Sequence, residues 1–293
     1  MNLANGYGFY QWRPASCLRV SGDDALTFLQ GQFTNDLQKN GSSNAVYGLW
    51  LNQKGKVLAD SFVRKISERE AWIVSYFSPA AVIRERLEAY IIADDVVIED
   101  VTGTMMGLTV TGTVMPADLG LNESAWVFPG RRMLEAHTEF VFPMSEGLAV
   151  RGKLTGGAEL SMEHMEHVRM AAGIPAVPAD LGPTDLPNEG GLETVAISYT
   201  KGCYLGQEVM ARLKSMGQVR RRLLRVRGVG EPPVRPALVF QGARKVGELR
   251  SAARENAGWI GLALVSLVNL QPDAGLALAA DGVPTIKFSD RHE

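Results

Sequence analysis

The sequence predicts an α+β protein with an antiparallel β-barrel at its C-terminal end. The first hundred residues alternate between segments with the two-residue period of strands and segments with the period of helices. From Val219 onward, short strand-like segments follow one another at regular spacing between glycines and prolines, which is typical of a small barrel or sandwich. The 293 residues, 46% of them hydrophobic, suffice for two or three compact domains.

The first unit has the pattern of a ferredoxin-like domain. Residues 23–39 carry Phe28, Leu29 and Phe33 at helical spacing behind two acidic residues. Ser78 and Pro79 predict the start of a second helix. The order strand, helix, two or three strands, helix, strand is that of the split βαβ motif with an added strand. The predicted strands are 16–22, a hairpin over 45–66 that turns at 52–55, 71–77 and 96–101.

A second α+β unit is predicted to follow. Residues 105–112 and 147–152 have the pattern of strands, and 158–173 that of a helix that ends at a glycine, whereas 113–146 gives no clear pattern. The segment 174–192 contains four prolines, and so long an irregular stretch is often functional. We therefore predict domains at 1–104, 105–217 and 218–293, the second containing the segment around Cys203 and interleaved with the first.

The bulk composition excludes several classes of protein. A net charge of -2 gives no overall field for nucleic acid or for an anionic membrane. No apolar run approaches the roughly 20 residues of a membrane span, and the N-terminal residues have the pattern of neither a secretory signal nor a transit peptide. Two cysteines exclude a disulfide framework and suggest a reducing compartment. We therefore expect a cytoplasmic protein without a stably bound metal.

Residues 199–208, Tyr-Thr-Lys-Gly-Cys-Tyr-Leu-Gly-Gln-Glu, place one of the two cysteines in a polar, glycine-flanked stretch. A free cysteine is often a small buried hydrophobe. Gly202 and Gly206, however, allow the backbone to turn tightly and approach a ligand. Lys201, Arg212 and the start of a helix over 206–214 would stabilise the thiolate of Cys203. The residues alone leave both interpretations open.

Other polar residues have alternative interpretations. Gln207 and Glu208 either contact a ligand or begin the helix with a favourable first-turn charge. Arginines over 220–227 form either a phosphate-binding patch, with Arg220 and Arg222 as its candidates, or a charged strand without ligand. His164 and His167 share a helix face but lack the spacing of a zinc site.

Several stretches together resemble one family. Lys-Gly-Cys-Tyr-x-Gly-Gln-Glu (201–208) is similar to the signature of the YgfZ family, which is related to the T-protein, or aminomethyltransferase, of the glycine cleavage system. The segments 20–36, 52–63, 169–175, 186–192 and 217–226 resemble further motifs of that family in the same order. The resemblance implies two interlocked T-protein-like α+β domains, a C-terminal β-barrel and a central pocket for tetrahydrofolate or a derivative.

The resemblance also implies a function. It implies a folate-linked accessory protein that supports iron–sulfur cluster assembly or repair in client enzymes, including tRNA-modifying enzymes. Its partners would be iron–sulfur client or assembly proteins, and Cys203 would act in the central pocket. The implied site comprises Cys203 with Lys201, Gly202, Tyr204, Gly206, Gln207, Glu208 and Arg212.

This chain departs from the T-protein pattern at two acidic positions. Ala171 stands where T-protein-like sequences carry the glutamate expected to hold the pterin ring, and the hairpin acid pair is reduced to Ala59 and Asp60. A pterin presents hydrogen-bond donors to such a carboxylate, so Asp60 or Glu189 would have to take that part. The alternative function is a tetrahydrofolate-dependent one-carbon transferase of the aminomethyl type. The missing acids and the cysteine motif favour the accessory protein.

Overall fold

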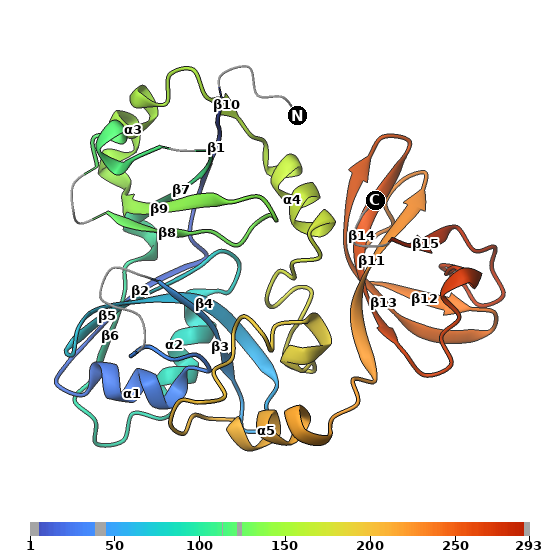
Figure 1. Ribbon diagram of the computed structural model, residues 1–293, viewed down its shortest axis with the longest axis horizontal. Coiled ribbons are helices and arrows are strands. Elements are labelled where there is room, and N and C mark those ends of the chain that lie inside the picture. Colours follow the sequence, from blue (N-terminus) through green and yellow to red (C-terminus); the bar gives the residue numbers. More distant parts are fainter. Residues whose placement is uncertain (1–5, 39–44, 113, 122–124, 290–293) are drawn as a thin grey trace.

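A computed structural model describes residues 6–38, 45–112, 114–121 and 125–289 of the chain. This part contains three five-stranded sheets. Two sheets and their helices form the α+β part, and the third forms a separate C-terminal body beside it (Figure 1). Among the described helices, none has the length and apolar character needed to cross a membrane. The predicted α+β class and the C-terminal antiparallel barrel are both confirmed.

The first sheet follows the sequence pattern closely. Its strand order is β3-β4-β5-β2-β6, and all its neighbouring strands are antiparallel. Apolar side chains of two helices and of one sheet face form a buried layer, because each helix presents one apolar stripe. The elements are β2 (Ser16–Ser21), α1 (Ala25–Gln32), β3 (Val46–Leu51), β4 (Val57–Ser67), β5 (Glu70–Ser75), α2 (Ala80–Glu88) and β6 (Val97–Asp100).

The second sheet has the order β10-β1-β7-β9-β8 and takes its second strand from the N-terminal end of the chain. β1 is antiparallel to β7, with Gly8 opposite Thr111 and Trp12 opposite Gly107. Because β1 precedes the whole first sheet in sequence, the two α+β units interlock. The strands are β1 (Gly8–Trp12), β7 (Met105–Thr111), β8 (Trp126–Pro129), β9 (His137–Pro143) and β10 (Ala158–Glu159).

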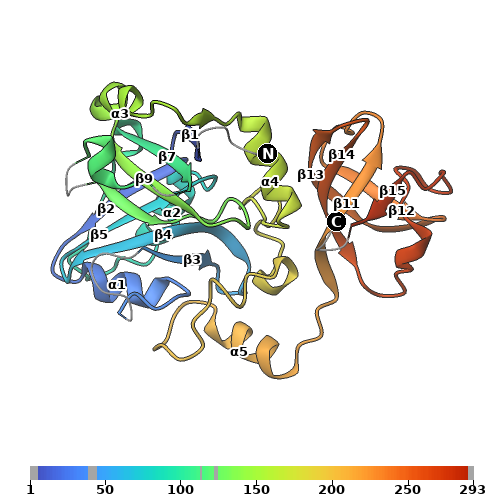
Figure 2. The ribbon, with the colours of Figure 1, turned by 45° about the horizontal axis from the view of Figure 1, so that its top comes forward.

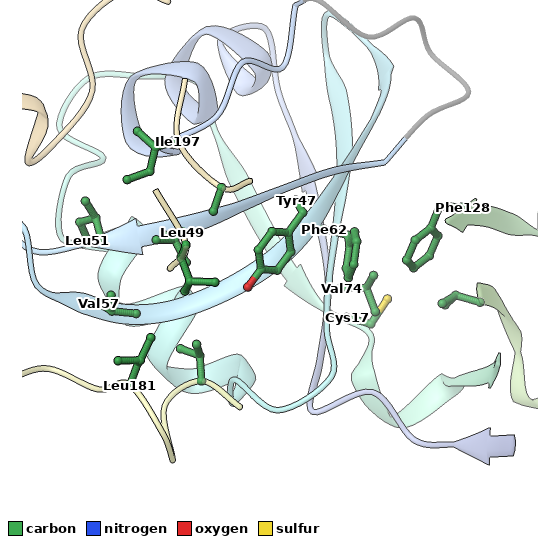
Figure 3. Packing of buried hydrophobic residues seen from close by; sticks show 14 of the residues in the cluster. Cys17, Tyr47, Leu49, Leu51, Val57, Phe62, Val74, Phe128, Leu181 and Ile197 are labelled. Atoms are coloured by element: carbon green, nitrogen blue, oxygen red, sulfur yellow. The ribbon is translucent and has the colours of Figure 1, made fainter. Parts of the chain in front are cut away.

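The largest core cluster joins the two sheets. Phe62 of β4 lies against Phe128 of β8 with ring centroids 4.6 Å apart, and Cys17 is fully buried beside Val74 and Phe62 (Figure 3). Burial raises the pKa of the Cys17 thiol to about 12. Cys17 is therefore an inert core residue, and Cys203 is the only other cysteine in the sequence.

Three predictions about single elements need correction. Residues 147–152, predicted as a strand, lie in helix α3 (Gly147–Lys153), whose buried residues Gly147 and Val150 have helical spacing. The helix predicted over 158–173 is shorter: β10 comes first and α4 (Met162–Ala171) begins behind the cap residue Ser161. The helix predicted over 23–39 ends at Gln32 in α1, and residue 39 lies outside the described residues.

The C-terminal body is a curled antiparallel sheet of order β12-β13-β14-β11-β15 (Figure 2). Met170 of α4 packs against Ile260 and Leu262 of this sheet, which attaches the barrel to the α+β part. The linker before it contains α5 (Gln207–Met216). The strands are β11 (Arg221–Val229), β12 (Ala237–Gln241), β13 (Arg244–Glu255), β14 (Gly258–Ser266) and β15 (Ile286–Phe288).

Short 3₁₀ turns occupy several connections. They are η1 (Thr102–Thr104), η2 (Pro116–Leu119), η3 (Met144–Glu146), η4 (Pro187–Gly190) and η5 (Pro272–Ala274). The proline-rich stretch 174–192 contains η4 and no strand or longer helix.

Candidate functional site

Cys203 lies at the surface, just before α5. Its side chain is exposed, which excludes the interpretation as a buried hydrophobe. It lines a groove of about 440 Å³ whose other walls are the end of α1 at Gly31 and Gln32, the β3–β4 turn at Gln53, and residues 204–209. The thiol is therefore open to a second molecule.

The backbone around the thiol is fixed by contacts of its own motif. Gly206 has φ +88°, a value that favours glycine, and forms the N-cap of α5. The Leu205 N–H donates to the Gly31 carbonyl at 3.2 Å. Gln207 Oε1 accepts from the Tyr204 N–H at 3.3 Å. The motif thus forms a tight turn that places Cys203 three residues before Gly206 and docks it on α1.

Lys201 is a structural residue of this turn. Its side chain is buried, and Nζ donates to the carbonyl oxygens of Gln30 and Phe33, both at 2.6 Å, and of Asn35 at 3.0 Å. Burial lowers the pKa of Lys201 to about 8, so the ammonium is still mostly protonated at neutral pH. The sequence allowed Lys201 to pair with an anionic ligand. In the structure the ammonium instead donates its hydrogen bonds to carbonyl oxygens at and beyond the C-terminal end of α1. A cation is favoured at that end of a helix.

Lys201→Met is expected to lower the free energy of unfolding by about 2–4 kcal/mol, because three carbonyls lose a buried, charged donor. Urea denaturation measures the change. Lys54→Met is the matched control, since Lys54 is exposed in the β3–β4 turn and should shift stability by less than about 0.5 kcal/mol. Equal stabilities of the two variants would contradict the capping role of Lys201.

The other residues of the motif divide between core and surface. Tyr204 is buried, with its ring 5.3 Å from Lys201 Nζ, and burial raises the pKa of its hydroxyl. Gly202 and Glu208 are exposed, and Arg212 is exposed outside the groove lining. Lys201 Nζ is bonded to carbonyls of the α1 region, and Arg212 does not line the groove. Of the positive charges predicted around the thiol, only the partial charge at the N-terminus of α5 is therefore left.

A second pocket, of about 400 Å³, lies where the two α+β sheets, α4 and the barrel meet. Its walls include the aromatic rings of Tyr10, Trp12, Tyr76 and Phe77. It also contains a buried arginine, Arg132, whose guanidinium carbon lies 3.8 Å from the Tyr76 ring centroid. This central pocket shares no lining residue with the groove of Cys203. Cys203, predicted to act in a central pocket, therefore lies in a groove separate from this one.

A buried carboxylate, that of Glu139, accepts hydrogen bonds from residues that line the central pocket. Glu139 is fully buried and accepts hydrogen bonds from Trp12 Nε1 at 3.1 Å and from the Tyr76 hydroxyl at 3.0 Å. Arg132 Nε lies 3.3 Å from Glu139 Oε1, and burial raises the pKa of the Glu139 carboxyl. Sequence reasoning missed both residues because the segment 113–146 has no clear period.

Asp60, one of the two carboxylates predicted to contact a folate, is enclosed by internal partners. Only 5% of the residue is exposed. Its oxygens accept from the hydroxyls of Tyr47 at 2.9 Å, Ser75 at 3.1 Å and Ser78 at 2.8 Å. Burial raises the pKa of Asp60. Asp60 does not line the central pocket, which argues against the predicted contact with a pterin ring.

Glu189 and Ala171 also face other parts of the molecule. Glu189 forms a two-pronged ion pair with Arg221, each contact 2.9 Å long, which fixes the start of the barrel. Ala171 packs against the cluster of Met170 with the barrel strands. Neither residue lines the central pocket. The carboxylate that does line it is Glu166, one turn earlier on α4.

The arginines of β11 have partners within the protein. Arg221 pairs with Asp185 and Glu189, Arg225 donates to the Ala171 carbonyl at 2.7 Å, and Arg227 pairs with Glu255. Arg220 is exposed and Arg222 half-buried. Arg221 and Arg227 are therefore neutralised by carboxylates, and Arg225 is held by a carbonyl.

The helical histidines form no metal site with their neighbours. His167 Nε2 lies 2.7 Å from Glu255 Oε1, which joins α4 to the barrel. Among the described residues, no group of three or more His, Cys, Asp or Glu side chains is arranged to hold a metal ion.

Two family models match the chain, the GCVT N-terminal domain over residues 2–115 and the CAF17 C-terminal beta-barrel domain over residues 220–289. The iron-sulfur cluster assembly factor IBA57, mitochondrial, of Mus musculus is 27% identical over 90% of this chain and 82% of that protein. The tRNA-modifying protein YgfZ of Blochmanniella pennsylvanica is 25% identical over 72% of this chain and 69% of its own. Over most of its length the chain is thus similar to proteins named YgfZ and IBA57.

The fold of this chain is also that of a T-protein. The glycine cleavage system aminomethyltransferase T from Bartonella henselae superimposes with a TM-score of 0.78 over 94% of this chain and 82% of that chain. Its sequence identity is 16%, so the likeness establishes the fold alone. It confirms the T-protein-like architecture predicted from the motifs.

Proposed function

We propose that this protein, which is similar to YgfZ and IBA57, supports the assembly or repair of iron–sulfur clusters in client enzymes, including enzymes that modify tRNA. The observation that carries the proposal is the exposed thiol of Cys203, held on a tight turn by its own motif. Relatives named for iron–sulfur cluster assembly and for tRNA modification support it. A protein that acts on other proteins needs its reactive group at the surface.

The thiol supplies one ligand for a cluster. A cluster normally takes four thiolates, two of them sometimes replaced by histidine. Cys17 is buried in the core, so the remaining ligands for a cluster at Cys203 come from the client or assembly protein. The cluster is then cargo shared at an interface, and the open groove beside the thiol leaves room for that partner.

A bacterial host that lacks its own YgfZ protein tests this function. The present chain should restore the activity of an iron–sulfur enzyme of tRNA modification, measured as the modified nucleoside content of its tRNA. Failure to restore it, with the chain present at normal abundance, would overturn the proposal. The one-carbon transferase stays the less favoured alternative, since Asp60 is enclosed by internal partners.

We further propose that tetrahydrofolate or a derivative binds in the central pocket. The residues there fit a planar polar heterocycle: aromatic rings form the walls, Glu166 lines the pocket beside its ion-pair partner Arg169, and the buried guanidinium of Arg132 lies against the Tyr76 ring. When bound, the folate would supply a carrier for one-carbon units. The chain's own residues would orient it by stacking and by the charges of Glu166 and Arg132.

Arg132→Met is expected to weaken tetrahydrofolate binding about tenfold or more, because the pocket loses its buried donor. Calorimetry on the full chain measures the affinity. Arg220→Met removes the same charge from an exposed position outside the pocket and should leave it unchanged. Equal binding by the wild type and both variants would place the folate elsewhere.

The remaining expectations extend the same proposal. We expect the protein to act in the cytoplasm, whereas the IBA57 relatives are named as mitochondrial. Its partners are iron–sulfur client or assembly proteins.

Direct binding of tRNA through Arg220 and Arg222 is disfavoured, because neighbouring arginines on β11 form ion pairs within the protein. The division into domains at 1–104, 105–217 and 218–293 stays a prediction.

A further inference from the structure

A third cavity, of about 340 Å³, opens between the two α+β sheets. It is formed by the end of β4, the start of β5 and the facing strands β7, β8 and β9. It shares no lining residue with the groove of Cys203 or with the central pocket. Its lining residues are Arg64, Ile66, Glu70, Trp72, Met105, Trp126, Val141 and Pro143.

Most of this cavity wall is apolar. Two indole rings, Trp72 and Trp126, line it together with Met105 and Val141. Apolar walls with a few polar groups are typical of sites for small organic molecules, in which the walls bind the body of the ligand and the polar groups fix its orientation. The body of a fitting ligand is therefore aromatic or aliphatic.

Two hydrogen-bond donors in this wall lack an acceptor. Trp126 is 3% exposed, and its Nε1 has no partner among the described residues. Arg64 Nε is equally without a partner, and no described carboxylate lies within ion-pair distance of its guanidinium, which makes a 3.4 Å contact to the Ala125 carbonyl. Buried donors without acceptors are rare in folded proteins because each costs free energy.

The one carboxylate in the wall does not supply the missing acceptor. Glu70 Oε1 accepts from Arg19 Nε and from Trp72 Nε1, both at 2.9 Å. Its charge is balanced by Arg19, and this pairing lowers the pKa of Glu70. Among the described residues, the positive charge of Arg64 therefore has no carboxylate partner.

We infer that this cavity binds a small carboxylic acid with an aromatic or aliphatic body, whose carboxylate is held by Arg64 and Trp126. The two groups without a partner, Trp126 Nε1 and Arg64 Nε, are both donors, so the ligand must supply acceptors. The positive charge of the guanidinium favours an anion over a neutral amide. The indole rings and aliphatic side chains receive the body. The site is independent of the folate and of the thiol.

Calorimetry with 4-phenylbutyrate, 4-phenylbutyramide and 4-phenylbutylamine on the full chain tests this inference. We expect the carboxylate to bind at least about tenfold more tightly than the amide, and the amine to bind weakest. Arg64→Met should reduce the affinity for the carboxylate to that for the amide. Lys65→Met is the matched control, because the next side chain of a strand lies on the other face, and it should change nothing.

Trp126→Phe keeps an aromatic wall but removes the N–H donor, so it should weaken carboxylate binding by about threefold to tenfold. It also serves as the second variant if Arg64→Met lowers the unfolding midpoint. The inference is overturned if the carboxylate and the amide bind the wild type equally, if none of the three probes binds at millimolar concentration, or if Arg64→Met and Lys65→Met bind the carboxylate alike.

Discussion

Cys203→Ala is expected to abolish support of iron–sulfur enzymes while the melting temperature stays unchanged. The side chain is exposed, so its truncation leaves no cavity, and the free energy of unfolding should change by less than about 0.5 kcal/mol. The proposed thiolate ligand is lost altogether. Two measurements on the same variant check this: the modified nucleosides of tRNA in the complemented host, and thermal unfolding of the purified protein.

Cys17→Ala is the matched control for this experiment. Cys17 is fully buried in the cluster between the sheets, so alanine there should cost on the order of 1 kcal/mol or more and leave activity intact at equal abundance. Full complementation by Cys203→Ala would disprove the role of the thiol. A fall in its melting temperature large enough to explain lost activity through abundance would do the same.

Arg169→Met is expected to lower the free energy of unfolding by about 3–5 kcal/mol, because it strands a buried charge. Arg169 is 2% exposed and lies 2.7 Å from Asp180, which is fully buried. It also donates to the Ile174 carbonyl at 2.7 Å and to Ser251 of β13 at 3.3 Å. One side chain thus connects α4, the proline-rich segment and the barrel.

Urea denaturation of a small set of variants measures this effect. Arg84→Met removes an exposed partner of Glu88 and should cost less than about 1 kcal/mol. The double variant Arg169→Met, Asp180→Asn should recover part of the loss, because no unpaired charge is left inside. An Arg169→Met protein as stable as Arg84→Met would contradict this account of the ion pair.

The fold class was predictable because the apolar period of the first sheet is clear. The hairpin predicted over 45–66 corresponds to β3 and β4, and the helix predicted behind Ser78 and Pro79 corresponds to α2. Residues 147–152 misled the prediction, since a short segment with Leu148, Val150 and small residues fits both periods. Only the neighbouring buried residues decide in favour of a helix there.

The surroundings of the motif were less predictable, because side-chain partners come from distant segments. Lys201 was interpreted as a possible ligand-binding charge, but its acceptors are carbonyls at the end of α1. Asp60 was predicted to contact folate, but in the structure its carboxylate accepts hydrogen bonds from the hydroxyls of Tyr47 and Ser78. Arg132 carries no sequence signal, since its importance arises from aromatic rings of β1 and of the segment just after β5.

The placement of β1 between β10 and β7 has a consequence for synthesis of the protein. A ribosome releases Gly8–Trp12 long before Met105–Thr111, its antiparallel partner. The nascent strand therefore waits, with both backbone edges unpaired, while the entire first sheet is translated. Pairing over so long a sequence distance is slow and exposes the chain to aggregation. Chaperones that hold nascent chains should consequently determine the yield of this protein more than its final stability does.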